Sequence, residues 1–185
     1  AKTALSGGTD VCFCDSYYTS PVSTTGYFSM NSSATNSGGW ASSQMRTNIC
    51  GTSLSSYSGT IIAVIPAALR AVLKSVTKYT DNTGNNSTSA SAVTATKDYF
   101  FLLSEFEVFG SISRANSNVA SKQAQYAYYS AGNSKVKYKH NGTSAAARWW
   151  LRSPLASSSD GFENVNTNGT VEDRTARASF GFAPG

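Results

Sequence analysis

The stretch that decides the fold is Arg148-Trp-Trp-Leu-Arg-Ser-Pro154, late in the chain. Two tryptophans followed by a leucine predict a strand that packs against a hydrophobic core. Because neighbouring side chains of a strand point to opposite faces, at least one of Trp149 and Trp150 should be buried. Proline cannot donate to a sheet ladder, so the strand is expected to end at Pro154.

Beyond this strand the composition changes to Ser, Asn, Asp, Gly and Thr. The run Val165-Asn-Thr-Asn-Gly-Thr-Val171 predicts a β-hairpin, since Asn-Gly favours the tight turns that join two antiparallel strands. The two valines mark the strand ends on either side of that turn.

Upstream of the strand, hydrophobic spacing and turn residues indicate several short elements. Ser104 and Glu107 match a capping box, which together with Gly110 predicts a short helix. Pro66 suits the first turn of another helix. We expect strands at residues 11–14, 26–30 and 98–103, helices at 40–48, 66–75, 104–110 and 122–130, and a loop over 81–97. Few helices, many short strands and long polar loops predict a single α+β domain over residues 1–185.

Charge in this chain is sparse and scattered. Charged residues make up 14% of the chain and the net charge is +5, without a dense basic run. The nearest candidate, Lys135-Val-Lys-Tyr-Lys-His140, is interpreted as an edge strand guarded by lysines. No apolar run is long enough to span a membrane. We therefore expect neither a nucleic-acid partner nor membrane insertion.

Catalytic chemistry finds little support in the sequence. The one histidine, His140, lies in a lysine-rich stretch where exposure is expected. No Gly-x-Ser-x-Gly, Walker or dinucleotide-binding pattern occurs. Glu105 and Glu107 lie two residues apart. We expect Glu105 to bind an arginine, such as Arg46 or Arg152, because structural ion pairs outnumber catalytic ones. We therefore expect no enzyme, no catalytic residue and no cofactor.

Metal-ligating residues form no recognisable pattern. The chain has three cysteines, and the odd number excludes a complete disulfide framework. Either Cys12 or Cys14 could pair with Cys50, and the sequence leaves that choice open. The spacing of these cysteines and His140 matches no zinc site. We therefore predict no bound metal.

Several blocks of sequence, taken together and in order, resemble one known family. They are Gly38-Gly-Trp40, Ser43-x-Met-Arg46, Asp98-Tyr-Phe-Phe-Leu-Leu-Ser-Glu-Phe-Glu-Val-Phe-Gly110, Gln125-Tyr-Ala-Tyr-Tyr129, Trp149-Trp-Leu-Arg-Ser-Pro154, Phe162-x-Asn-Val165, Gly169 and Gly181-x-Ala-Pro-Gly185. Over residues 38–185 the chain resembles the C-type-lectin-fold variable proteins of diversity-generating retroelements, from gut bacteria and phages. In that family a reverse transcriptase copies a template with errors at adenines, and the diversified residues lie on an exposed ligand-binding face.

The resemblance implies a C-type-lectin-like fold in which a fixed frame holds variable side chains. The implied frame residues are Trp149, Trp150, Arg152, Pro154, Phe162, Val165, Gly169, Gly181 and Pro184. The implied ligand-facing positions are Leu155, Asp160, Gly161, Asn166, Thr167, Asn168, Thr170, Asp173, Arg174, Thr175, Arg177, Ala178 and Phe180. Arginine and phenylalanine are the expected anchors among them. Residues 149–185 are therefore interpreted as the variable, ligand-facing region.

The composition of this region agrees with that interpretation. An Asn codon randomised at its adenines cannot become a codon for Lys, Gln, Glu, Met or Trp. Between Leu155 and Phe182 there is no Lys, Gln, Met or Trp, although Lys is frequent elsewhere. Glu163 and Glu172 are the exceptions, so we predict that these two positions are not diversified.

The predicted function is that of a receptor or adhesin, which displays a hypervariable surface to a protein or glycan on a cell or virion. The resemblance implies a location on a phage virion, on a bacterial surface or outside the cell. Enzymes of the formylglycine-generating type share this fold. They need a reactive cysteine pair in the C-terminal half, whereas no cysteine follows Cys50.

Two alternatives stay open. One is a calcium-dependent carbohydrate-binding lectin, although its candidate ligands match no fixed-spacing calcium loop. Those candidates are Glu163, Asn164, Asn166, Glu172 and Asp173. The other alternative is a purely structural module of a phage fibre or cell-surface protein.

Overall fold

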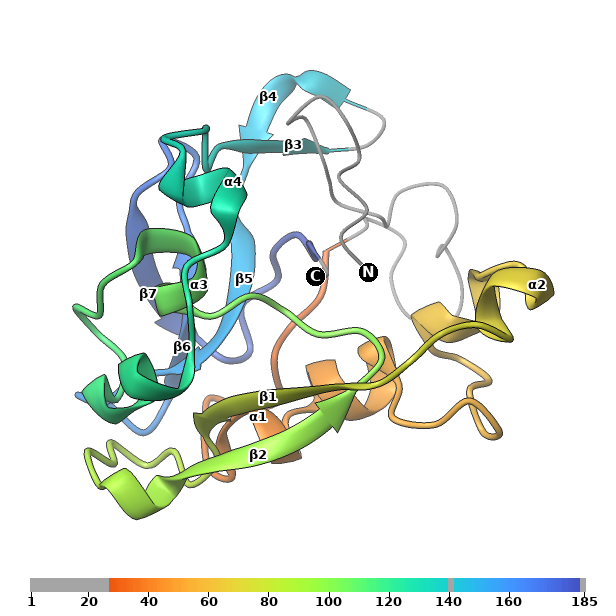
Figure 1. The fold of residues 1–185 in the computed structure, drawn as a ribbon. Helices are drawn as coiled ribbons and strands as arrows, with labels where there is room; N and C mark the ends of the chain where they lie inside the picture. The colour runs from red at the N-terminus through yellow and green to blue at the C-terminus, as the bar shows by residue number, and fades with distance from the viewer. Residues whose placement is uncertain (1–26, 140–141, 184–185) are drawn as a thin grey trace.

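The computed structural model describes residues 27–139 and 142–183, and Figure 1 shows how their elements are arranged. The helices are α1 (Gly39–Ser42), the π-helix η1 (Met45–Cys50), η2 (Ile61–Val64), α2 (Ala67–Arg70), η3 (Ala90–Ala92), α3 (Glu105–Phe109), η4 (Ser117–Lys122) and α4 (Ala127–Ser130), of which η2, η3 and η4 are 3-10 helices. The strands are β1 (Val76–Asp81), β2 (Val93–Asp98), β3 (Lys137–Lys139), β4 (Gly142–Ala147), β5 (Trp149–Pro154), β6 (Gly161–Val165) and β7 (Val171–Thr175). The fold is α+β, as the sequence predicts.

The strands of the described residues form three small antiparallel sheets. β1 pairs with β2, β3 pairs with β4, and the third sheet has the order β5-β6-β7. In the third sheet β6 is central, with Val165 opposite Trp149 on one side and opposite Val171 on the other. This sheet, drawn in shades of blue in Figure 1, carries the C-terminal segment that the sequence singled out.

Both tryptophans of the deciding stretch are buried in the core. Trp149 and Trp150 are fully enclosed, and each indole N–H donates to a backbone carbonyl. Trp149 Nε1 lies 3.0 Å from the Lys135 oxygen, and Trp150 Nε1 lies 2.7 Å from the Phe28 oxygen. These bonds avoid the cost of an unsatisfied buried donor. Because the two rings lie on opposite faces of β5, the core extends to both faces, and all six residues of the strand are buried.

The sequence signals for the ends of α3 and for the β6–β7 turn predicted the observed structure correctly. The capping box of α3 is confirmed, since Ser104 accepts from the Glu107 N–H while the Glu107 side chain accepts from the Ser104 N–H. Gly110 ends this helix with φ 72°, a left-handed conformation that glycine adopts without strain. The β6–β7 hairpin is confirmed, and Gly169 takes φ 84° in its turn.

Three predicted helices differ in extent from their sequence patterns. The helix expected at 66–75 is only α2, which lies at the periphery in Figure 1, with Leu69 and Val72 49% and 67% exposed. The helix expected at 122–130 is replaced by the end of η4 and by α4. Between them the Tyr126 N–H donates to the Glu107 carbonyl at 2.9 Å, which holds that segment against α3. The helix expected at 40–48 is divided into α1 and η1 near Ser43, whose hydroxyl donates back to the Trp40 carbonyl.

Two predictions about residues 81–103 were wrong. Residues 81–97 are not a loop throughout, because Val93–Asp98 forms β2, whose pattern is mostly polar since much of the strand is exposed. Apart from Asp98, which ends β2, residues 98–103 add no strand to the three sheets. Arg152 binds this segment instead, with its N–H 2.9 Å from the Leu103 oxygen and its Nη1 2.7 Å from the Leu102 oxygen. One backbone and one side-chain hydrogen bond from Arg152 thereby take the place of the ladder that the apolar run suggested.

Some predictions lie outside the described residues. These are the strand at 11–14, the pairing of Cys12 or Cys14 with the buried Cys50, and the exposure of His140. In place of the strand expected at 26–30, Phe28 forms an isolated antiparallel bridge with Phe180. The lysine-rich stretch contains β3, as expected. Within residues 27–139 and 142–183, no helix is long and apolar enough to cross a membrane.

Candidate ligand-binding surface

A buried arginine joins β5 to the rest of the molecule. Arg152 is fully enclosed, and its Nε donates to the Thr80 hydroxyl of β1 at 2.8 Å. Its Nη1 lies 2.5 Å from Glu107 Oε2 of α3 and 2.7 Å from the Leu102 carbonyl oxygen. A buried guanidinium that lost these partners would destabilise the fold strongly. The Trp-Trp-Leu-Arg-Ser-Pro stretch is therefore held in place by three separate segments.

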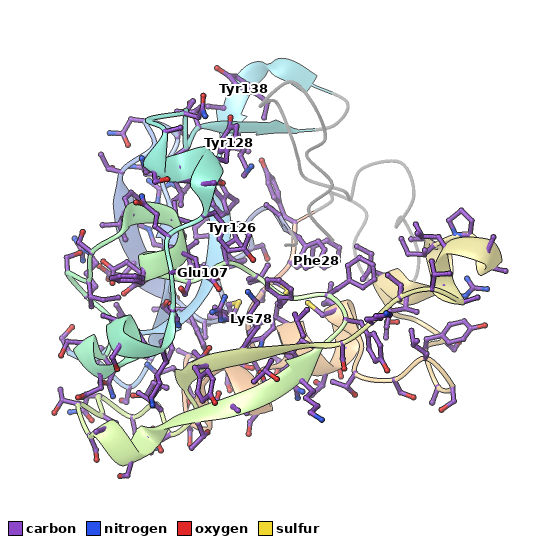
Figure 2. All side chains as sticks on the ribbon, viewed as in Figure 1. Phe28, Lys78, Glu107, Tyr126, Tyr128 and Tyr138 are labelled. Carbon is purple, nitrogen blue, oxygen red and sulfur yellow. The ribbon has the colours of Figure 1, made fainter. Side chains whose placement is uncertain are left out.

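Glu107 holds a second cation on its other side. Lys78 Nζ of β1 lies 2.8 Å from Glu107 Oε1 and 3.0 Å from the Tyr126 hydroxyl, and Figure 2 labels these three side chains. The same Nζ lies 4.0 Å from the centre of the Phe101 ring, a contact that favours a cation. Burial raises the pKa of Glu107, but the charges and hydrogen bonds of Arg152 and Lys78 outweigh it, so this pKa lies below its ordinary value. Glu107 is therefore a bridging carboxylate of the frame.

The expected arginine partner of Glu105 was wrong. Arg46 pairs with Asp98 at 2.7 Å, and Arg152 pairs with Glu107. The Glu105 oxygens accept instead from the backbone N–H groups of residues 113–115 and from the hydroxyl of residue 113. Consecutive N–H groups of one loop thus take the place of a guanidinium. Glu105 fixes that loop against the beginning of α3.

Glu163 of β6 lies beside the Glu105 carboxylate. It is fully enclosed, and no donor group of the described residues reaches either of its oxygens. Burial, followed by the charge of Glu105 and a hydrogen bond with it, raises the pKa of Glu163 well above its ordinary value. A Glu163 carboxyl that keeps its proton donates to Glu105. The two carboxyl groups therefore lie close together between α3 and β6, and the raised pKa of Glu163 favours its protonated form.

An open hollow of about 530 Å³ adjoins this contact. Its lining residues are Ser113, Arg114, Ala115, Ala156, Ser157 and Val171. Arg114 forms an ion pair with Asp173 of β7, and these side chains are 42% and 39% exposed. The hollow is therefore where the frame meets one of the predicted ligand-facing residues.

Two of the predicted ligand-facing residues are buried, so the prediction was wrong for them. Leu155 is 5% exposed and forms a bridge with Ala115. A Cβ atom at Gly161 would lie 2.6 Å from the Arg174 carbonyl oxygen, which leaves no room for a side chain. Asn36 donates to the carbonyls of both residues, at 3.4 Å and 2.9 Å, and holds the loop between them inward. Their position in the sequence carried no information about this burial.

The other predicted positions, Phe180 aside, divide between the two ends of the β6–β7 hairpin and its second strand. One end has Asn166, Thr167, Asn168 and Thr170; the other has Asp160, Thr175, Arg177 and Ala178; Asp173 and Arg174 lie between on β7. The Asp160 carbonyl accepts from the Ala176 N–H at 2.8 Å, which brings the loop before β6 beside the turn after β7. A five-residue strand spans roughly 17 Å. A small ligand can therefore contact one end, whereas a macromolecule can contact both.

Phe180 is half-buried and belongs partly to the core. Its ring centre lies 4.8 Å from that of Trp150, and the Arg148 guanidinium lies 5.7 Å from it. Its backbone exchanges hydrogen bonds of 2.8 and 3.0 Å with Phe28. Phe180 therefore packs beneath the proposed surface, where most of its ring is less accessible to a ligand.

Sequence reasoning missed two residues that shape this surface, Arg114 and Asn36. Both lie in polar segments without hydrophobic periodicity. The side-chain partner of Arg114 is 59 positions away, and the Asn36 side chain reaches carbonyls more than a hundred positions away. No pattern within a short window of sequence could have identified either residue.

The described residues offer little to a metal ion. No group of three His, Cys, Asp or Glu side chains within residues 27–139 and 142–183 is placed to hold one. Glu163 contacts Glu105, and Glu172 forms ion pairs with Arg148 and Arg174. Of the other candidate calcium ligands, Asn164 has a buried side-chain amide with no hydrogen-bond partner among the described residues.

The fold and the site define a small α+β domain in which a buried polar frame supports a partly exposed hairpin. A family model matches residues 20–184, so the chain belongs to that family, which is described as a domain of unknown function (DUF6273). The match includes both the frame and the hairpin. No curated protein and no solved structure matches the chain.

Proposed function

We propose that this domain binds a ligand through its β6–β7 hairpin surface, as a C-type-lectin-like variable protein diversified by adenine-directed mutagenesis. The observation that carries the proposal is a contrast within one sheet. Every residue of β5 and β6 is buried, whereas every residue of β7 is partly exposed, and the turn residues Thr167 and Asn168 are exposed. Exposed positions of this kind can change with little effect on stability.

The proposed variable surface is smaller than the sequence alone suggested. It consists of Asp160, Asn166, Thr167, Asn168, Thr170, Asp173, Arg174, Thr175, Arg177 and Ala178. Leu155 and Gly161 are left out because they are buried, and Phe180 is assigned to the frame because it packs on Trp150. The partner would be a protein or glycan on a bacterial or virion surface, where the domain itself would be displayed.

The two glutamates of this segment support the same division. A randomised Asn codon cannot yield glutamate, and both glutamates have contacts that random substitution would break. Glu163 is enclosed beside Glu105, while Glu172 lies 2.6 Å from Arg148 Nη1 and 3.2 Å from Arg174 Nη2. The residues that the codon argument excludes from diversification are thus residues with structural partners.

A triple variant with Thr167→Ala, Thr170→Ala and Arg177→Ala tests the proposal at both ends of the hairpin. We expect each substitution to change the free energy of unfolding by less than about 0.5 kcal/mol, since the side chains are exposed. The wild-type chain and the triple variant would be screened on arrays of bacterial surface glycans and surface proteins. Wild type should capture a ligand that the equally stable triple variant loses.

A structural role predicts a different result. If neither the wild type nor sister sequences with other residues at these positions captured any ligand, the domain would be a structural module. The mechanism of diversification is tested in the source genome. We expect a near-copy of the segment for residues 149–185, with Asn codons at the variable positions, beside a reverse-transcriptase gene.

A further inference from the structure

The hollow beside β7 is built around a cation in a fixed position. The Arg114 backbone is held from two sides: its N–H donates to Glu105 at 3.3 Å, and its carbonyl accepts from the Ala156 N–H at 3.0 Å. The next residue, Ala115, donates to Glu105 at 3.1 Å and bridges to Leu155. The Arg114 side chain therefore extends from a rigid base into the rim of the hollow.

The counter-ion of this cation lies on the proposed variable surface. Arg114 pairs with Asp173, and both side chains are about two-fifths exposed. Exposed ion pairs of this kind contribute little to stability, so a competing anion can replace the aspartate. Asp173 can arise from a randomised Asn codon, whereas Arg114 lies far upstream of the variable region. The hollow thus combines a constant guanidinium with a variable neighbour.

We propose that this hollow binds the carboxylate of an acidic saccharide, with Arg114 as the anchor and residue 173 controlling access to it. The inference deepens the proposed function and rests on it. A guanidinium matches a carboxylate with two parallel hydrogen bonds. In the present chain Asp173 occupies that guanidinium and repels a second carboxylate. Variants with a neutral residue at position 173 leave it open.

The lining of the hollow favours a saccharide over a peptide as the source of the carboxylate. Ser113 and Ser157 offer hydroxyl groups, and the remaining lining side chains apart from Arg114 are alanine and valine. Protein interfaces are anchored by Trp, Tyr and Arg side chains, and of these residue types the lining has Arg114 but no aromatic residue. The volume of about 530 Å³ lies within the range of small-ligand sites.

Calorimetry at low salt with trigalacturonic acid, and with neutral galactotriose as the matched probe, tests the proposal on the full chain. Asp173→Asn should bind trigalacturonic acid at least about fivefold more tightly than wild type, the equivalent of about 1 kcal/mol. Glu172→Gln is the control, because it removes one negative charge from the neighbouring position of β7, where the carboxylate pairs with Arg148 and Arg174 and not with Arg114. It should leave the affinity within about twofold of wild type.

The guanidinium is tested in the Asp173→Asn background. Arg114→Gln should abolish the gained affinity, and Arg114→Lys should keep only part of it, since lysine cannot bind a carboxylate with a planar fork. A melting curve for each variant separates loss of binding from loss of folding, and Arg114→Lys provides the answer if Arg114→Gln is unstable.

Three results would overturn the inference: equal affinity of wild type and Asp173→Asn, binding that survives loss of Arg114, or tighter binding of a glutamate-rich peptide, titrated in the same way, than of trigalacturonic acid. These outcomes are separate from failure of the proposed function. If the triple hairpin variant loses a ligand while Asp173→Asn gains no acidic saccharide, only the hollow is wrong. If no chain binds any array ligand, the proposed function is wrong as well.

Discussion

β6 and β7 are neighbours in one hairpin, yet they differ in almost every physical respect. β6 lies between two strands and is buried along its whole length, with Phe162 in the core and Glu163 against Glu105. β7 pairs with β6 on one side, and each of its residues retains some exposure. Five ladder pairs join the two strands in regular register, from Gly161 opposite Thr175 to Val165 opposite Val171.

This difference shows how one hairpin can combine constancy with variation. The backbone of β7 is positioned by the ladder, which depends little on side-chain identity. Substitution of Asp173 or Thr175 should therefore disturb the fold little as long as β6 stays fixed, whereas Glu172 of the same strand pairs with Arg148 and Arg174. β6 in turn depends on contacts with α3 and β5 that tolerate little substitution. Three predictions test whether the boundary between frame and surface lies where the structure puts it.

The largest effect is expected from Arg152→Met. The substitution removes the cation from Glu107 and leaves Thr80 and the Leu102 carbonyl without their donor, so stability should fall by about 3–5 kcal/mol. Arg177→Met is the matched control, because the same change on the exposed turn should cost less than about 0.5 kcal/mol. Urea denaturation of both variants measures the difference. Similar losses of stability at the two positions would contradict the division between buried frame and exposed surface.

An intermediate effect is expected from Phe180→Ala. The ring is half-buried against Trp150, so its removal should destabilise the domain by about 1–3 kcal/mol. Thermal unfolding would show this as a lower Tm, whereas Ala178→Gly on the same turn provides a nearby comparison. An unchanged Tm for Phe180→Ala would contradict a packing role for this ring and would place residue 180 on the proposed variable surface.

The smallest change in stability is expected from Glu163→Gln near pH 5, and this change should grow as the pH rises. Because the pKa of Glu163 is raised in the folded chain, its contribution to stability is fully present below the ordinary value of 4.5 and is lost as pH rises through the folded pKa. Near pH 5 the substitution should change stability by less than about 1 kcal/mol, since glutamine also donates to Glu105. At higher pH the variant should become the more stable protein.

Urea denaturation across pH 5–9 measures this divergence. Glu172→Gln is the control, because that half-buried glutamate pairs with two arginines. The free energy of unfolding of this variant should still decrease as the pH rises, as it does in the wild type. Glu107, whose pKa is lowered, contributes stability above its ordinary pKa and loses that contribution as the pH falls. Its titration therefore does not account for a loss of stability as the pH rises. Parallel curves for wild type and Glu163→Gln would show that the two glutamates do not share a proton.

Much of the fold followed from short stretches of sequence. The capping box of Ser104 and Glu107, the Asn-Gly hairpin and the strand that ends at Pro154 all depend on residues a few positions apart. The prediction failed for β2 because its strand residues are largely polar, and for residues 66–75 because an apolar stripe alone cannot show that a helix reaches the core. The ligand-facing surface was predicted as individual positions within one segment, and burial removed Leu155 and Gly161 from that set.

The sequence by itself determined the α+β class and the position of the hairpin, and it predicted that the two glutamate positions are not diversified. Only the tertiary structure decided that Glu105 binds backbone N–H groups, that Arg152 pairs with Glu107, and that Arg114 meets Asp173. The physical reason is the separation along the chain between the residues that interact. Capping, turns and strand alternation arise from neighbours along the chain, whereas the partner of a buried charge is chosen by whichever group the packed fold brings within hydrogen-bonding distance.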